Sequence, residues 1–267
     1  MSLRQSSLIT LLLGIFISLQ VLAGTCENHS TPTRAVLIEL FTSEGCSSCP
    51  VADRWMSKLV PGVFPSSQVV TLAFHVDYWD HLGWRDTFGD KAYSARQFAY
   101  TKMSGSSFAF TPQVLLGGHN YNQWASDSRF SQDVRYALGT LPAANFTLLQ
   151  QMPEQGGVAF EVQAQLKQGL NLNEVRVYAA LFQNGIESDV LNGENGGNRL
   201  HHDFVVRGFV TSQAMDSNGH ISMRDNFKMP TGVRSDQLGI AVFAQDRKTG
   251  AVLQAMSAPL CPNRIKM

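Results

Sequence analysis

Two different periodicities of apolar residues divide the chain. In the first half, short runs that are apolar at every position alternate with segments in which apolar residues recur at helical spacing. The first kind is typical of strands buried on both faces, and the second of amphipathic helices. Buried strands are predicted at 35–41, 68–76 and 108–118, and helices at 51–59, 90–103 and 126–138. This alternation predicts an α/β unit over residues 34–142.

Beyond Pro142 the pattern changes to the alternation of apolar and polar residues that half-buried strands show. Strands are predicted at 158–164, 175–182, 204–210, 220–227, 238–245 and 251–257, with turn signals between them. A short helical piece is expected only around 188–191. We therefore expect a mostly antiparallel β-sandwich domain over residues 145–260, packed on the α/β unit.

Residues 1–25 have the pattern of a secretory signal peptide. Arg4 supplies the positive charge, residues 8–22 form a short apolar core, and Ala23 and Gly24 are small residues suited to cleavage. The apolar run is too short for a dependable membrane span, so we expect no stable membrane-spanning segment. The predicted localisation is periplasmic or secreted.

The net charge and the cysteine content indicate which kind of partner the protein binds and in which cellular compartment it resides. The formal net charge is +0, from 21 Lys and Arg against 21 Asp and Glu, and no basic cluster stands out. No nucleic-acid partner is expected, because such proteins usually carry a basic patch. Four cysteines in an exported chain are compatible with an oxidising compartment. Two of them, Cys26 and Cys261, lie near the chain ends and could either pair or remain free thiols.

The candidate chemistry lies at Cys46-Ser47-Ser48-Cys49, between the first predicted strand and the first predicted helix. A thiol at a helix N-terminus faces free backbone N–H groups and the positive end of the helix dipole, which stabilise its thiolate. Cys-x-x-Cys pairs in such a position are usually redox-active. We expect Cys46 to be the exposed nucleophile and Cys49 to resolve the mixed disulfide. A structural zinc site would need a second pair of ligands, so no metal or cofactor is expected.

The residues around the cysteines resemble the signature of a family of exported thioredoxin-like proteins of unknown function, found in bacteria and plants. The matching segments are ELFTSEGCSSCPVAD at 39–53, FHVDYWD at 74–80, TPQ at 111–113 and, more loosely, HDFVVR at 202–207. The resemblance implies an α/β thioredoxin-like domain followed by the β-rich half. It supplies no substrate.

The resemblance also implies roles for residues away from the cysteines. Thioredoxin-like domains place a cis-proline opposite the Cys-x-x-Cys motif, and Thr111-Pro112 fits that role, with Thr111 presenting its backbone to an extended substrate. Glu39 is a carboxylate within an otherwise apolar strand, where a charge is costly to bury. Relatives keep such an acid as a proton relay to the second thiol. The alternative is that Glu39 pairs with a nearby Arg or Lys.

An aromatic segment follows the second predicted strand. We expect His75 and Asp77 to lie on one face, where they could share a proton or flank the thiols. Tyr78, Trp79 and Trp84 could form the floor of an apolar peptide groove, or pack against the second half. The other histidines considered are expected at the surface without a metal role: His29, His201 and His202.

Three functions are compatible with these residues. The first is an exported thiol–disulfide oxidoreductase that acts through Cys46 and Cys49 on protein or small thiols, with a partner that recycles the dithiol. The second is a carrier of copper or another soft metal, with His75 as a third ligand. The third is a non-enzymatic binding protein in which Cys46–Cys49 is a permanent structural disulfide.

Overall fold

The computed structural model describes residues 24–151, 156–213 and 215–261. Residues 1–23 of the predicted signal peptide therefore lie outside the described residues. Its last residue, Thr25, begins strand β1 (Thr25–His29), which the sequence analysis did not predict. No helix in the part of the chain that the structure describes is long and apolar enough to cross a membrane.

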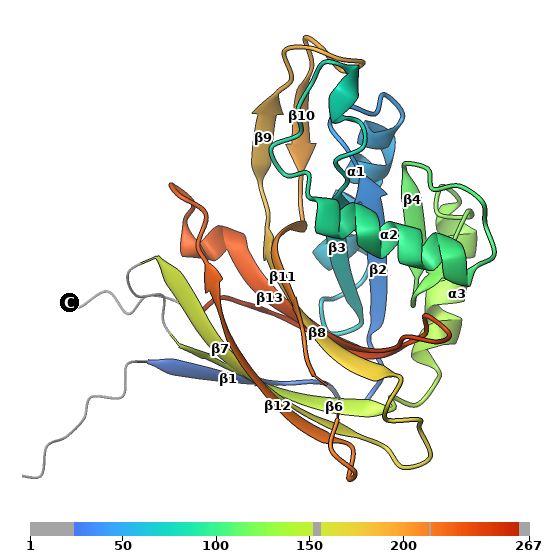
Figure 1. Cartoon of the computed structure of the whole chain (residues 1–267), viewed down its shortest axis with the longest axis vertical. Coiled ribbons are helices and arrows are strands. Elements are labelled where there is room, and N and C mark those ends of the chain that lie inside the picture. The colour runs from blue at the N-terminus through green and yellow to red at the C-terminus, as the bar shows by residue number, and fades with distance from the viewer. Residues whose placement is uncertain (1–23, 152–155, 214, 262–267) are drawn as a thin grey trace, which may run out of the picture.

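The largest element is an eight-stranded sheet with the strand order β14-β13-β8-β11-β3-β2-β4-β5 (Figure 1). Its strands are β2 (Val36–Thr42), β3 (Val69–His75), β4 (Gln113–Leu116), β5 (His119–Asn120), β8 (Val175–Gln183), β11 (Val205–Thr211), β13 (Leu238–Asp246) and β14 (Val252–Pro259). Strands β2 and β3 are parallel and fully buried, as their continuous apolar runs predicted.

The two halves of the chain share this sheet. Strand β11 pairs in parallel with β3 at Val205 and Ala73, and the Ala73 N–H donates to the Phe204 carbonyl at 2.8 Å. One hydrophobic core accordingly contains residues of both halves, such as Leu40 and Phe243. Alternation along a strand says which face is buried but not which strand lies beside it. This continuity was therefore not predicted.

A second, four-stranded antiparallel sheet has the order β1-β6-β7-β12. Its other strands are β6 (Ala144–Gln151), β7 (Gly157–Leu166) and β12 (His220–Lys228). A second hydrophobic core, with Leu148 and Val162 on one side and Val242 on the other, joins it to the β8–β13–β14 part of the large sheet. A disulfide between Cys26 and Cys261, with 5.8 Å between their Cα atoms, connects the two ends of the described chain. The pairing that the sequence left open is thus present.

The three predicted helices are present and flank the α/β part of the sheet (Figure 1). They are α1 (Cys49–Lys58), α2 (Lys91–Met103) and α3 (Asp127–Leu138), with short helical turns at η1 (Leu59–Val63), η2 (Asp80–Leu82) and η3 (Ser235–Gln237). The carboxylate of Asp90 caps α2 by accepting from the Ala92 N–H at 2.8 Å.

The prediction of a short helix around 188–191 is wrong. Strand β9 (Ile186–Asp189) pairs there with β10 (Arg199–His202) in an antiparallel hairpin. Cross-strand pairs such as Glu187 with Arg199, 3.1 Å apart, stabilise the hairpin. Residues 190–198 connect the two strands, and we call them the cover loop.

Candidate functional site

The Cys46–Cys49 disulfide lies where β2 leads into α1, with 5.4 Å between the two Cα atoms. Cys49 is the first residue of the helix and Pro50 follows it in the first turn, where a missing N–H costs no hydrogen bond. The Cys49 N–H donates to the Cys46 carbonyl at 3.1 Å, which closes the turn between them. The strand-to-helix placement predicted from the sequence is confirmed.

The expectation that Cys46 is exposed is wrong. Its exposed fraction is 1% and that of Cys49 is 0%, whereas Ser47 and Ser48 between them are exposed. Burial depends on segments distant in the sequence, which local sequence could not reveal.

The cover loop closes over the motif through three hydrogen bonds. The Asn195 side-chain amide donates to the carbonyl of Glu44 at 2.8 Å and to that of Cys46 at 3.0 Å. The Ser47 N–H donates to a carboxylate oxygen of Glu194 at 3.0 Å. The second half of the chain thus restricts access to the disulfide.

Trp79 connects the cysteine turn to the predicted cis-proline. Its indole Nε1–H donates to Thr111 Oγ1 at 2.8 Å, and its Cβ lies where a Cβ added to Gly45 would come within 3.0 Å. The Thr111–Pro112 peptide bond is cis, as predicted. Strand β4 follows it and pairs with β2, with Gln113 opposite Phe41. The fold therefore brings Trp79, Thr111 and Pro112 to the cysteine turn.

Glu39 forms an ion pair with Arg96, which is the alternative to a proton relay that the sequence analysis considered. Its carboxylate lies 2.7 Å from the Arg96 guanidinium and accepts from the Tyr100 hydroxyl at 2.8 Å. Side chains alternate between the faces of a strand, so Glu39 and Thr42 lie on opposite faces of β2. Thr42 Oγ1 donates to Asp53 of α1 at 3.1 Å, which places Glu39 on the face away from that helix.

His75 and Asp77 are not paired with each other, so the shared proton that was one of two possibilities for them is not present. His75 is fully buried, and its Nδ1 lies 2.7 Å from Asp86 Oδ2. Asp77 instead accepts from the Ser94 hydroxyl, because β3 ends at His75 and the chain turns toward α2. Tyr78 also turns toward α2: its hydroxyl donates to Gln97 at 3.1 Å, and its ring stacks on Phe98.

A second buried residue, His202, was wrongly expected at the surface. Its exposed fraction is 1%, because β10 packs against α1. Its Nε2 lies 3.5 Å from Glu44 Oε1 and its Nδ1 3.8 Å from Asp53 Oδ2. Its ring meets that of His75 edge-on, with 5.0 Å between the centroids. We call these residues the acid–histidine cluster: Glu44, Asp53, His75, Asp86 and His202.

Several polar atoms of the acid–histidine cluster are buried without a hydrogen-bond partner. Among the described residues they include both ring nitrogens of His202, Nε2 of His75 and Oε1 of Glu44. The other oxygen of Glu44 accepts from the Trp84 indole at 2.8 Å. No group of three or more His, Cys, Asp or Glu within the described ranges is arranged to hold a metal ion. A cluster this incompletely satisfied is unusual in a protein interior.

The charges of the acid–histidine cluster perturb one another. Burial alone lowers the pKa of His202, but the carboxylates of Asp53 and Glu44 outweigh it and raise that pKa to about 10. Burial raises the pKa of Glu44, but the charge of His202, 3.5 Å away, and hydrogen bonds from Ser188 and Trp84 outweigh it and bring that pKa below its usual value. The pKa of Asp86 is likewise lowered, because His75 and two backbone N–H groups outweigh burial.

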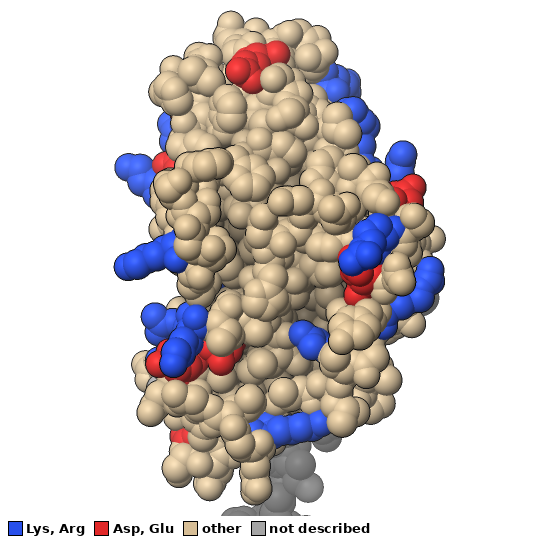
Figure 2. Space-filling view, turned by 90° about the vertical axis from the view of Figure 1, so that its right-hand side faces the viewer, with Lys and Arg blue, Asp and Glu red and all other residues tan. Residues whose placement is uncertain are grey.

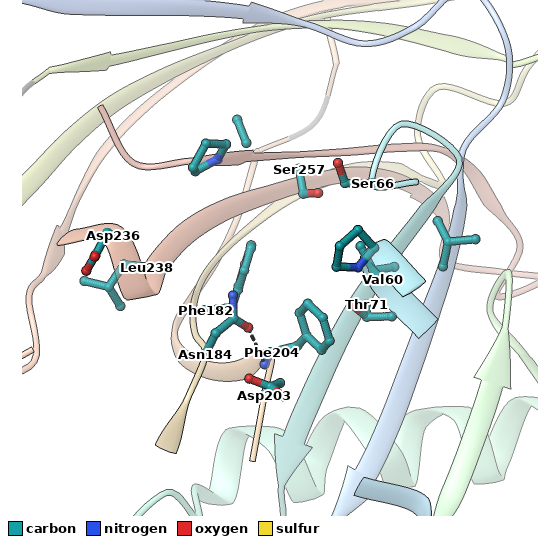
Figure 3. A pocket seen from close by; sticks show the side chains of 14 residues that line it. Val60, Ser66, Thr71, Phe182, Asn184, Asp203, Phe204, Asp236, Leu238 and Ser257 are labelled. Atoms are coloured by element: carbon teal, nitrogen blue, oxygen red, sulfur yellow. Dashed lines mark hydrogen bonds between the residues drawn. The ribbon is translucent and has the colours of Figure 1, made fainter. Parts of the chain in front are cut away.

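A cavity of about 430 Å³ lies away from the cysteines, between η1 and strands β3, β8, β13 and β14 (Figure 3). The rings of Phe182 and Phe204 line it, together with Thr71, whose buried hydroxyl has no hydrogen-bond partner. The Asn184 side chain accepts from the Phe204 N–H at 2.8 Å on one wall (Figure 3). None of the predicted site residues lines this cavity, so the chemistry is better sought at the disulfide.

The face of the molecule in Figure 2 has a largely uncharged centre. Lys and Arg are scattered along its edges rather than gathered into one basic patch (Figure 2). This face therefore offers no basic patch for a nucleic acid.

Comparisons with known proteins find one family model and solved structures of similar fold. The family model described as "Protein of unknown function (DUF1223)" matches residues 37–245. A crystal structure of an Agrobacterium tumefaciens protein, solved by a structural genomics consortium, is 22% identical with a TM-score of 0.60, covering 89% of this chain and 98% of that one. HBP35 of Porphyromonas gingivalis is 14% identical with a TM-score of 0.66, covering 89% and 80%. No curated protein matches the chain. The two structures are similar in fold.

Proposed function

The chain belongs to the DUF1223 family of proteins of unknown function, and we propose that it is an exported thiol–disulfide oxidoreductase. The observation that supports this proposal most is the Cys46–Cys49 disulfide at the N-terminus of α1, with the cis Thr111–Pro112 peptide connected to it through Trp79. The proposal includes a thioredoxin-like arrangement of the α/β half. It also includes export to the periplasm or the exterior, where a disulfide can persist.

The reaction is an exchange between the disulfide and a dithiol substrate. A substrate thiolate attacks one sulfur of the pair, forming a mixed disulfide as the Cys46–Cys49 bond breaks and its electron pair stays on the other sulfur. A second substrate thiolate then attacks the mixed disulfide. The substrate leaves as a disulfide, and Cys46 and Cys49 retain two electrons and take up two protons. The reverse sequence reduces a substrate disulfide, and a second thiol–disulfide partner restores the starting state.

Both cysteines are buried and the cover loop is bonded to the backbone of the cysteine turn, so the proposal includes displacement of this loop when a substrate binds. With the loop displaced, the backbone of Thr111 and the indole of Trp79 would line the substrate site beside Cys46. We assign Cys46 as the attacked sulfur, since it precedes the helix whereas Cys49 is the first residue within it. Glu39 is not assigned a role in proton transfer, because its charge is paired with Arg96.

The test is the reduction potential of Cys46–Cys49 in the mature protein, measured by equilibration with glutathione or dithiothreitol and thiol trapping. Thiol–disulfide enzymes lie between about −120 and −270 mV, whereas structural disulfides lie below roughly −300 mV. The Cys26–Cys261 disulfide in the same chain is the internal control and should remain oxidised. A potential below −300 mV for both disulfides would refute the proposal.

Trapping assigns the two cysteines separately. Cys49→Ser should accumulate a mixed disulfide at Cys46 with a small disulfide such as oxidised glutathione, because no resolving thiol is present. Cys46→Ser should accumulate much less. Equal trapping by the two variants would reject the assignment of Cys46 as the attacked sulfur.

A further inference from the structure

We propose that His202 is a positioning residue for the dithiol: its imidazolium offsets the two carboxylates that flank the Cys-x-x-Cys motif, so that a thiolate can form there. This inference rests on the proposed function and assigns a part of the site to the second half of the chain. It starts from three observations: His202 is buried, neither of its ring nitrogens makes a hydrogen bond, and its nearest charged groups are Glu44 and Asp53.

The two acidic residues flank the cysteine motif along the chain, one on each side. Glu44 precedes Cys46 by two residues, and the same Asn195 amide binds the carbonyls of both. Asp53 is one helical turn after Cys49, which is about 6 Å along α1. A thiolate at either sulfur would repel both carboxylates, and water cannot screen them because Glu44 is 0% and Asp53 5% exposed.

His202 is the cationic group placed to offset this repulsion. The other groups around its ring are His75, whose Nδ1 is already directed to Asp86, and Phe88. The neighbouring His201 is turned outward, to Glu187 and Asp203. The raised pKa of His202 keeps the imidazolium charged at neutral pH. With His202 the two flanking acids carry one uncompensated negative charge, and without it they carry two.

This arrangement also gives the β9–β10 hairpin a chemical role. His202 lies on β10, about 150 residues beyond the cysteines, and reaches the site because β10 packs against α1. Its conformation is not explained by structural hydrogen bonding, since both ring nitrogens lack a partner. The charge of His202 would favour the reduced state, in which the broken S–S bond leaves one sulfur as a thiolate and the other as a thiol after two electrons and one proton are taken up.

The test is the equilibrium between the disulfide and dithiothreitol at pH 7, measured on the mature chain with both native disulfides formed. An equilibrium readout does not depend on how readily the cover loop opens. His202→Gln should shift the equilibrium about tenfold toward the disulfide, equivalent to one pKa unit at the thiol. Asp53→Asn should shift it in the opposite direction by a similar factor. The double variant His202→Gln/Asp53→Asn should return to within about threefold of the wild type.

The matched control is His201→Gln, which removes a histidine of the same strand that pairs with carboxylates at the surface, and it should change the equilibrium less than twofold. A role of His202 in stability alone would not give shifts of opposite sign that cancel. Shifts of the same sign, or a His202→Gln value equal to that of His201→Gln, would overturn the proposal while leaving the oxidoreductase function intact. A wild-type disulfide that dithiothreitol cannot reduce would overturn both.

Circular dichroism shows whether each variant is folded. If His202→Gln does not fold, Asp53→Asn alone carries the test. A shift of its equilibrium toward the dithiol supports the proposal, and no shift or the reverse shift overturns it.

Discussion

Two groups of buried charges lie on opposite faces of the β2–β3 part of the sheet, and they differ in how far their polar atoms are satisfied. On one face, Glu39 is paired with Arg96 and accepts from Tyr100. The Arg96 guanidinium lies about 5 Å from each of five aromatic rings, those of Phe74, Tyr100, Tyr178, Phe209 and Phe243. On the other face, the acid–histidine cluster has an excess of acid and several unpartnered atoms.

This difference in hydrogen bonding indicates that the Glu39–Arg96 pair has a structural role and that the acid–histidine cluster has a chemical one. In the Glu39–Arg96 pair one negative charge balances one positive charge. Arg96 also donates to Gln245 of β13, so this guanidinium joins the two halves of the chain in a fixed geometry. Because the two charges already balance each other, this pair has no net charge with which to stabilise a new charge nearby. The acid–histidine cluster lies beside the disulfide, where the charge changes on reduction. Unsatisfied buried groups cost stability, so they are expected where chemistry requires them.

The largest expected effect comes from breaking the structural pair. Arg96→Met should lower the free energy of unfolding by ~3–5 kcal/mol, because it leaves the Glu39 carboxylate buried without a partner. Urea denaturation followed by circular dichroism measures this loss.

The double variant Glu39→Gln/Arg96→Met is the control, and it should recover much of the loss because no uncompensated charge remains. Arg96→Met should leave the dithiothreitol equilibrium of Cys46–Cys49 within about twofold of the wild type. A tenfold shift would show that the two charge clusters are not separate in function.

The pH dependence of stability reports on the other cluster. The pKa of His202 is about 10 in the folded protein against 6.5 as its ordinary value, so the folded state binds the proton more tightly. This stabilisation is complete below pH 6.5 and is lost as the pH rises to about 10. The loss should be a few kcal/mol, at ~1.4 kcal/mol for each pKa unit.

The comparison of wild type with His202→Gln isolates this contribution, because the tyrosines and other groups titrate in both proteins. Urea midpoints are measured between pH 6 and pH 10. The difference between the two proteins should shrink as the pH rises. A constant difference would mean that His202 is not charged in the folded state.

A smaller effect is expected from loosening the cover loop. Asn195→Ala removes two hydrogen bonds to the cysteine turn, each worth ~1 kcal/mol. Reduction of Cys46–Cys49 by dithiothreitol should become up to roughly thirtyfold faster, because the loop opens more often when about 2 kcal/mol of hydrogen bonding is lost. Asn192→Ala, at an exposed position of the same loop, should leave the rate unchanged. Equal rates for Asn195→Ala and the wild type would exclude Asn195 as the residue that holds the loop closed.

The smallest expected effect on stability comes from a solvent-exposed ion pair, which serves as the reference for the buried pair. Arg129 and Asp133 form an ion pair one turn apart on α3, and Arg129 is 58% exposed. Arg129→Ala should change the free energy of unfolding by less than ~0.5 kcal/mol, apart from its effect on helix propensity. A loss as large as that of Arg96→Met would contradict burial as the cause of the difference.

The sequence by itself determined the features that depend on neighbouring residues. Continuous apolar runs predicted β2 and β3, helical spacing predicted α1 to α3, and the Cys-x-x-Cys motif was correctly placed between a strand and a helix. The cis conformation of Thr111–Pro112, expected from the family resemblance, is also present. These predictions succeeded because backbone geometry and burial of a single strand or helix follow from local periodicity.

Only the tertiary structure decided which distant residues complete the site. Asn195 and Glu194 bind the backbone of the cysteine turn, and His202 is placed beside Glu44, although all three are about 150 residues away in the sequence. The alternation of β10 fixes which of its residues share a face, but not that this face meets α1. Burial and pKa are properties of everything packed around a group, so they follow from the pairing of segments rather than from the residue itself.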